Sequence, residues 1–294
     1  MSVRTGNRSF SWRPYKGASL AYVTALDSGD PSKKVDFRDE VYELNYPFSG
    51  KGKFILKTIN RFSGIDWGTK DMAIAYDTWW NTRNRKSYVF NPSNPNIKPK
   101  IISDRNYQDT YSDPGSFLRS RNEFNRSVLK MHYGNIFLRG QGFSPSGQFP
   151  FIDKVNTKTF EKTRVYQSSY TDKIESIIDY DPKKNQLTVS IESPSEYPNY
   201  YTKKVKSGKL EKLTNLKNPF LELQNVKKEK ITYLRNDGVE LSGILYLPLN
   251  YDKEKKEKMP MILWAYPREF KDRQSASQNT KNSNEFTYPY YLSL

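Results

Sequence analysis

The sequence has 294 residues, enough for one large or two ordinary domains, and its 48 Lys and Arg against 32 Asp and Glu give a formal net charge of +16. The absence of Cys excludes disulfides and thiolate metal sites, and the absence of a long apolar run excludes a membrane-spanning helix. The first residues lack the apolar segment of a secretory signal, and no feature of the sequence fixes a compartment.

The positive charge is spread along the chain rather than gathered in one motif. Basic runs lie at 81–86, 119–126, 203–230 and 253–258. A basic protein can bind nucleic acid, anionic membranes or acidic peptides. Because no nucleic-acid-binding module accompanies the charge, we interpret these runs as a solvated, lysine-rich surface and expect no nucleic-acid partner.

Aromatic residues make up 15% of the chain and include 22 Tyr, a usage that favours strands over helices. Short apolar-alternating runs recur in four sets of four. The runs lie at 9–14, 19–26, 39–47 and 54–60; at 62–68, 71–80, 86–92 and 99–104; at 127–133, 134–140, 149–156 and 161–167; and at 173–181, 185–193, 199–206 and 210–215.

Four strands repeated at a spacing of roughly 45 to 65 residues are typical of β-propeller blades. The predicted fold is therefore mostly β, with a partial β-propeller of about four four-stranded blades. A β-sandwich is the alternative, since it also uses short strands and frequent turns. Residues 105–126 have little apolar periodicity and contain Asp-Pro-Gly, so we predict a long loop inserted between blades.

The last part of the sequence has a different pattern. Residues 216–230 are interpreted as a connector, which places a predicted boundary between a propeller domain at 1–225 and a second domain at 226–294. Two strands joined by a tight turn at 236–238 follow, because Asp-Gly between apolar runs is a strong hairpin signal. Met261 to Ala265 contains no polar residue, which predicts a strand buried on both faces, as in the parallel sheet of an α/β protein.

Several sequence stretches together resemble the prolyl oligopeptidase family of serine peptidases, and within it the glutamyl endopeptidase-like branch. They are FSWRP, YVTALDSGDP, RDEVYELNYPFSG, RFSGIDWG, YSDPGS, ESPSEYPNYY, SGKLEKLTN, RNDGVELSGILYLP and WAYPREFKD. The resemblance implies a propeller followed by an α/β-hydrolase domain, a Ser-Asp-His triad that cleaves peptides after Glu through an acyl-enzyme, and no cofactor. It also implies that this chain is an interior piece: late blades, then the first strands of the hydrolase domain.

The catalytic residues of such an enzyme are not found in the sequence. The nearest match to the G-x-S-x-G nucleophile motif is Gly142 to Gly147, which has Pro inside the turn and is interpreted as a blade loop. His132 is the one histidine, and its place in a strand-like run is typical of a half-buried structural residue. We therefore expect this chain alone to be inactive and to need the remainder of its own polypeptide, with peptides or proteins as substrates. A non-enzymatic propeller that binds partners is the alternative.

Two residues near the end of the sequence are candidate active-site residues, Tyr266 by resemblance and Arg268 from the chemistry of its guanidinium. Tyr266 matches the Tyr whose hydroxyl donates to the oxyanion, although the family usually has Gly-Gly after it and this sequence has Pro267-Arg268. Arg268 is a candidate for pairing with an acidic substrate side chain. No metal ligands are predicted. The pair Trp79-Trp80 is assigned to packing between blades, with a binding surface as the alternative.

Overall fold

A computed structural model describes the chain except for residues 256, 266–267, 279–284, 290–291 and 293–294. Its contacts divide it into two compact units, which are described separately. Unit 1 comprises residues 1–107, 117–137 and 155–161, and unit 2 comprises residues 108–116, 138–154 and 162–294.

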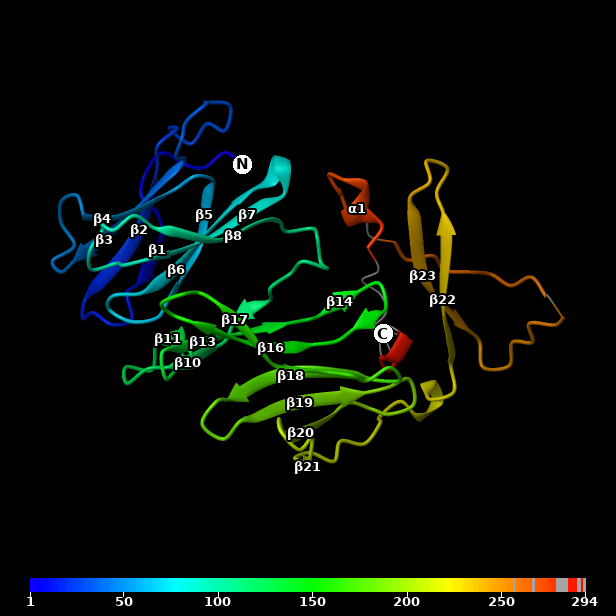
Figure 1. Cartoon of the computed structure of the whole chain (residues 1–294). Coiled ribbons are helices and arrows are strands. Elements are labelled where there is room, and N and C mark those ends of the chain that lie inside the picture. The colour runs from blue at the N-terminus through cyan, green and yellow to red at the C-terminus, as the bar shows by residue number, and fades with distance from the viewer. Residues whose placement is uncertain (256, 266–267, 279–284, 290–291, 293–294) are drawn as a thin grey trace. The chain divides into compact units, whose positions relative to one another are not determined.

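Unit 1 contains two antiparallel sheets of four strands each, with the strands in sequence order (Figure 1). The first sheet consists of β1 (Arg8–Trp12), β2 (Ser19–Ala25), β3 (Asp39–Asn45) and β4 (Lys53–Thr58). The second consists of β5 (Arg61–Trp67), β6 (Ala73–Trp79), β7 (Asn84–Phe90) and β8 (Lys100–Asn106). Both sheets confirm the predicted sets of strands.

The core of unit 1 is formed by side chains from both sheets. The cluster of buried residues comprises Ala21, Val23, Val41, Ile55, Leu56, Trp67, Ala73, Ala75, Tyr88 and Phe90. On β2, β6 and β7 they alternate along the strand, as expected where one face of a pleated strand is buried. Ile55 and Leu56 are consecutive, where the register between β3 and β4 is irregular. Small residues on β6 and large aromatic residues on β5 and β7 allow the two faces to interdigitate closely.

A further sheet is formed by residues that come, in the sequence, after the second predicted set and before the last one. Its residues are divided between unit 1 and unit 2. Its order is β12 (Met131–His132), β13 (Asn135–Gly140), β16 (Phe151–Asn156) and β17 (Lys162–Gln167), with β9 (Ser116–Phe117) also paired to β13. In unit 2, β18 (Ile174–Asp181), β19 (Gln186–Glu192), β20 (Asn199–Lys204) and β21 (Leu210–Lys212) form the last four-stranded sheet. The predicted blade-like repeat is therefore confirmed.

The predicted long loop at 105–126 was only partly right. Besides β9, it contains β10 (Arg119–Arg121), which pairs with β11 (Ser127–Leu129) in a small hairpin. β9 and β10 are short and lack apolar alternation, so periodicity alone could not identify them, whereas β11 lies within the predicted run 127–133. A second small hairpin, β14 (Phe143–Ser144) with β15 (Gly147–Gln148), occupies the stretch interpreted as a blade loop.

The predicted hairpin after the connector is present. β22 (Lys227–Leu234) and β23 (Glu240–Leu247) pair along their whole length, and Gly238 in the turn has a φ of 77°. Positive φ carries no steric cost for Gly, which is why the Asp-Gly signal was reliable here. The helical elements of the described residues are short: they include η1 (Trp80–Thr82), η2 (Leu221–Leu223) and α1 (Arg273–Ala276), and residues 285, 286 and 292 are also helical.

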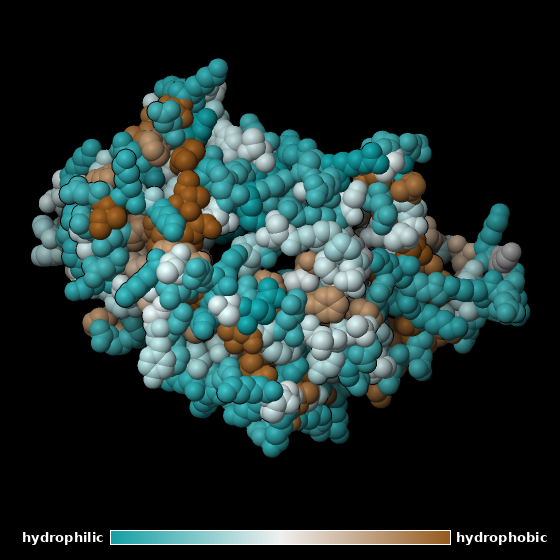
Figure 2. All heavy atoms as spheres, viewed as in Figure 1, coloured by the Kyte–Doolittle hydropathy of each residue, from teal (hydrophilic) through white to brown (hydrophobic). Residues whose placement is uncertain are grey.

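The predicted buried strand from Met261 to Ala265 is not formed in this structure. These residues have no strand assignment, and their side chains are 73–96% exposed from Met261 to Trp264. A strand buried on both faces needs partner strands and covering layers, and the described part of the chain provides neither for this segment. Elsewhere the visible face of the molecule is mainly hydrophilic, with scattered apolar groups (Figure 2). No helix among the described residues is long and apolar enough to cross a membrane.

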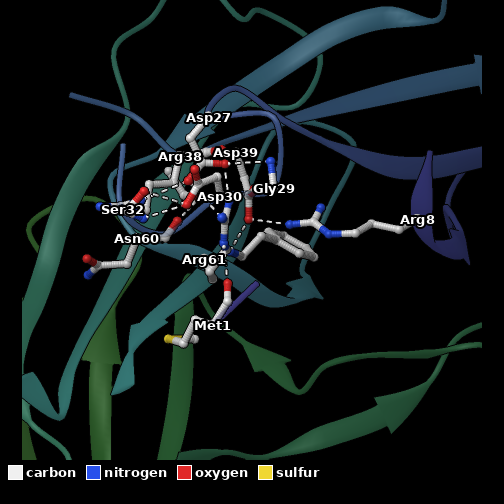
Figure 3. A network of polar contacts seen from close by, with 12 residues as sticks. Met1, Arg8, Asp27, Gly29, Asp30, Ser32, Arg38, Asp39, Asn60 and Arg61 are labelled. Atoms are coloured by element: carbon white, nitrogen blue, oxygen red, sulfur yellow. Dashed lines mark hydrogen bonds and ion pairs between the residues drawn. The ribbon is translucent and has the colours of Figure 1, made fainter. Parts of the chain in front are cut away.

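A buried ionic network joins the two sheets of unit 1 (Figure 3). Arg61, the first residue of β5, donates from Nη2 to Asp27 at 2.7 Å and from Nη1 to Asp39 at 3.1 Å. Arg38 donates to Asp27 at 2.8 Å, and Arg8 donates to Asp39 at 2.5 Å. Each buried carboxylate therefore has two guanidinium partners, as burial of an ionised group requires.

Candidate functional site

The candidate site predicted from the sequence lies in the segment that follows β23. Tyr266, the candidate oxyanion donor, lies outside the described residues. Arg268 is described and is exposed, so its guanidinium is accessible to a ligand. The geometry of the site is therefore built from the residues that follow Arg268 and from the contacts that hold them.

Gln108, in the loop after β8, holds the backbone on the C-terminal side of Arg268. Its amide nitrogen donates to the carbonyl oxygen of Glu269 at 2.6 Å, and its amide oxygen accepts from the backbone N–H of Lys271 at 3.2 Å. When an amide side chain donates to one backbone group of a segment and accepts from another, it makes the same pair of hydrogen bonds that a neighbouring strand would make. This bidentate contact fixes the path of the chain directly after Arg268.

Gln278 forms a second contact of the same kind in the opposite direction. Its Oε1 accepts from the backbone N–H of Thr110 at 2.7 Å and from the Thr110 hydroxyl at 2.8 Å, and its Nε2 donates to Asp109. Residues 108–111 thus bind both ends of the segment 269–278. Between these contacts, Asp272 caps α1 by accepting from the backbone N–H of Ser275 at 2.7 Å.

The turn between β22 and β23 provides a further anchor. Arg273 donates from Nη2 to the carbonyl oxygen of Gly238 at 2.6 Å. In the same turn Arg235 pairs bidentately with Asp237, at 2.8 Å and 2.6 Å, and these hydrogen bonds lower the pKa of the Asp237 carboxyl to about 2. The segment beside Arg268 is therefore tied both to the hairpin and to the loop at 108–111.

The other serine and histidine considered in the sequence do not form a catalytic pair. Ser144 lies on β14, and its hydroxyl donates to the carbonyl oxygen of Gly147 at 3.0 Å and lies 3.1 Å from the Ser146 hydroxyl. These contacts stay within the hairpin and give the oxygen no base. His132 is on β12, half-buried, with its ring 4.2 Å from that of Tyr133, in agreement with the structural interpretation.

Trp79 and Trp80 have different environments. Trp79 ends β6 in the second sheet, and the guanidinium of Arg38, which precedes β3 of the first sheet, lies 3.9 Å from its ring centroid. This contact supports the assignment of Trp79 to packing between blades. Trp80 is 53% exposed and carries the guanidinium of Arg83 at 3.6 Å. A cation over an indole face is a favourable arrangement.

Sequence reasoning did not find Gln108, Gln278 or the buried network around Arg61. The sequence does not indicate which groups an amide side chain will bind, because backbone groups in many parts of a chain can satisfy its donor and its acceptor equally well. The stretch YSDPGS (residues 111–116) was singled out for its resemblance alone. In the structure its first residue, Tyr111, donates its backbone N–H to Gln278 Oε1 at 3.3 Å.

Comparison with known proteins finds sequence relatives but no matching family profile. The chain is 35% identical over 301 aligned positions to the probable glutamyl endopeptidase, chloroplastic, of Oryza sativa subsp. japonica, which covers 97% of this chain and 32% of that protein. It is 33% identical over 302 positions to the protein of the same name from Arabidopsis thaliana, covering 97% of this chain and 31% of that protein. The chain thus spans about a third of the length of these relatives.

Two peptidases are among the solved structures that match the chain at low similarity. Oligopeptidase B from Trypanosoma brucei is 12% identical, with a TM-score of 0.45 over 81% of this chain and 31% of that chain. The acylaminoacyl peptidase from Pyrococcus horikoshii is 14% identical, with a TM-score of 0.43 over 82% of this chain and 32% of that chain. The relationship is carried by the plant sequences, which align with nearly the whole chain.

Proposed function

We propose that the chain belongs to the glutamyl endopeptidase-like branch of the prolyl oligopeptidase family, and that it supplies propeller blades and a candidate oxyanion loop to a serine endopeptidase that cuts after Glu. The observation that supports this most strongly is the alignment of 97% of the chain with proteins named probable glutamyl endopeptidases. That alignment includes the segment around Tyr266 and Arg268.

In this proposal Tyr266 and Arg268 have separate roles. The Tyr266 hydroxyl donates to the oxyanion that forms when a serine attacks the scissile carbonyl, a contribution of about 3 kcal/mol to transition-state stabilisation. Arg268 binds the carboxylate of the substrate Glu in a bidentate ion pair, which a lysine could not reproduce. Gln108 and Gln278 are positioning residues, because they hold the backbone beside Arg268.

The nucleophile, the acid and the base are proposed to come from residues that this sequence does not contain. Peptide hydrolysis by serine requires a base that takes the hydroxyl proton at neutral pH. His132 and Ser144 are occupied by local structural contacts and do not supply that chemistry. The 294-residue chain by itself is therefore proposed to bind without cleaving.

The test compares the 294-residue chain with the full-length gene product. Both proteins are treated with a fluorophosphonate that labels activated serines, and then assayed with matched fluorogenic peptides that carry Glu or Gln at the cleavage position. We expect labelling and Glu-selective cleavage by the full-length product only. Stoichiometric labelling of the short chain would contradict the assignment of the nucleophile, and equal cleavage of the two peptides would contradict the proposed specificity.

Variants of the full-length product separate the two proposed roles. Tyr266→Phe should lower kcat by about a hundredfold, because one preorganised donor is lost while the substrate still binds. Arg268→Gln should instead raise KM for the Glu peptide and leave the Gln peptide unchanged. A full-length product that binds peptides but cleaves none would favour the alternative of a non-enzymatic propeller.

A further inference from the structure

An open cavity of about 540 Å³ lies in unit 1 between the first strands of its two sheets. Its lining includes Phe10 and Trp12 of β1, Phe62 and Gly64 of β5, and Arg126 with Ser127 at the start of β11. Phe10 is 51% exposed and Trp12 is 47% exposed, so two large aromatic faces are open to solvent in one place. Exposed aromatic residues gathered in a hollow are typical of binding sites.

The walls of this cavity are strand edges. Within the described residues, β1 is hydrogen-bonded to β2 alone and has one edge without a neighbouring strand. β5 is hydrogen-bonded to β6 alone, but β11 packs beside it, and the backbone N–H of Phe62 on β5 donates to Asp39 at 2.7 Å. Both strands have an irregular register on this stretch, between Arg8 and Ser11 in β1 and between Phe62 and Gly64 in β5. An edge strand with unpaired backbone groups can accept an extended peptide as an additional strand.

The position of Arg126 in the lining is fixed by two contacts of the β10–β11 hairpin. Asn122, in the hairpin turn, donates from its amide to the carbonyl oxygen of Pro14, just after β1, at 3.1 Å. Arg119 of β10 pairs with the buried carboxylate of Asp66 on β5 at 2.5 Å. The hairpin is therefore held to both walls of the cavity, and Arg126 is placed between them.

Arg126 and Trp12 form the charged part of the cavity. The Arg126 guanidinium lies 5.8 Å from the centroid of the Trp12 ring, whose other neighbour is Phe48 at 6.1 Å in an edge-on arrangement. In the described part of the chain Arg126 has no ion pair, and the nearby Asp66 is engaged by Arg119. A guanidinium that is held over an aromatic ring without a carboxylate partner can bind one from a ligand.

We propose that this cavity binds an extended peptide segment with an acidic side chain, which pairs its carboxylate with Arg126 while its backbone lies along β1. The proposal extends the proposed peptidase function, since it makes the propeller part of the molecule a binding site for acidic segments of the substrate. The ligand class follows from the unpaired guanidinium, the exposed aromatic faces and the open edge of β1. The net charge of +16 favours the approach of such a ligand.

The experiment measures binding by isothermal titration calorimetry with the 294-residue chain, so that it requires no hydrolysis. The ligands are a short peptide that alternates Glu with Val, and its counterpart with Gln in place of Glu. Arg126→Gln removes the proposed partner, and Arg126→Lys keeps the charge without the planar fork. Arg121→Gln is the matched control, because Arg121 lies on the same hairpin, makes the same change in net charge and does not line the cavity.

We expect Arg126→Gln to weaken binding of the Glu peptide about tenfold, as the loss of a charge-assisted hydrogen bond predicts. Arg126→Lys should be intermediate, and Arg121→Gln should change binding by less than about twofold. Equal losses for Arg126→Gln and Arg121→Gln would overturn the proposal in favour of diffuse surface charge. Equal affinity for the Glu and Gln peptides would also overturn it.

The outcome is distinguishable from failure of the proposed function. Should the full-length product cleave no peptide while the short chain still binds the Glu peptide through Arg126, the binding site stands and the peptidase assignment fails. In the opposite case, the full-length product cleaves after Glu, Arg126→Gln does not affect this cleavage, and peptide binding does not depend on Arg126. This result would overturn the proposed binding site and leave the peptidase assignment intact.

Discussion

Replacing Arg61 with Met is expected to destabilise unit 1 strongly. The side chain of Arg61 is 3% exposed, and those of Asp27 and Asp39, which it bridges, are 0% exposed. Removing one member of a buried ionic group typically costs about 3–5 kcal/mol, because the partner charge stays buried. Here each carboxylate keeps a second guanidinium, Arg38 for Asp27 and Arg8 for Asp39, so the expected cost lies at the lower end, about 3 kcal/mol.

The measurement is urea denaturation followed by circular dichroism and tryptophan fluorescence. For a urea m value of about 2–3 kcal/mol/M, the midpoint should fall by about 1–1.5 M. Arg61→Lys keeps a charge but cannot bridge both carboxylates, and it should lie between the wild type and Arg61→Met. Lys209→Ala, which removes one partner of an exposed pair with Glu211, is the control and should change stability by less than about 0.5 kcal/mol. A loss below about 1 kcal/mol for Arg61→Met would refute the interpretation of the network as a joint between the two sheets.

The acid dependence of the same network and two other changes give further expected results. Burial raises the pKa of Asp27, but hydrogen bonds from Arg61 and Arg38 outweigh burial, so the pKa of Asp27 lies below its usual value. The stability that ionised Asp27 contributes should therefore be lost as pH falls through that lowered pKa, and acid titration of wild type against Arg61→Met would detect the loss. Gly115→Ala should lower the free energy of unfolding clearly more than Gly208→Ala in the same denaturation assay. Both glycines have positive φ, 84° and 69°, but a Cβ at Gly115 would lie 2.2 Å from the carbonyl oxygen of Arg139, whereas a Cβ at Gly208 would meet nothing within 4 Å. Equal losses of stability for the two variants would mean that the strain of positive φ alone, and not the clash with Arg139, determines the effect. Burial lowers the pKa of Lys228 to about 8, so Lys228 releases its proton at a lower pH in the folded chain than in the unfolded chain. The stability of the wild type relative to Lys228→Met should therefore rise between about pH 8 and 10.5. A stability difference that stays constant over this range would contradict the burial of Lys228.

The sheets could be predicted from the sequence because their signals are local. Each of the sixteen predicted runs overlaps a strand of the corresponding sheet, since alternation of apolar residues follows directly from burial of one strand face. β10 was missed because Arg119, Ser120 and Arg121 carry no apolar alternation. Its hairpin with β11 is held by the contact of Arg119 with Asp66 and by that of Asn122 with Pro14. Tertiary contacts, rather than propensity, determine such short strands.

The segment from Met261 to Ala265 illustrates the opposite case. Its composition predicts a strand buried on both faces, but a strand also needs partners, and the described residues leave Ile262 96% exposed. A local pattern can therefore indicate the environment that a segment is suited to without ensuring that the environment is present. The candidate site has the same division. Tyr266 was found by resemblance and Arg268 from the chemistry of its guanidinium, whereas the amides that hold the neighbouring backbone are visible only in the folded chain.

The contact between Gln108 and Glu269 also bears on the order in which the molecule folds. The two residues are 161 positions apart in the sequence, and closing a flexible loop of that length costs about 4–5 kcal/mol of chain entropy. The hydrogen bonds that Gln108 and Gln278 make are worth about 0.5–1.5 kcal/mol each, so they cannot hold an otherwise unfolded chain together. We therefore expect the segment after Arg268 to order only once the intervening sheets have formed and shortened the effective loop. Such a dependence would make the backbone beside a candidate substrate-binding residue one of the last parts of the chain to assemble, so that an incompletely folded molecule would not present it.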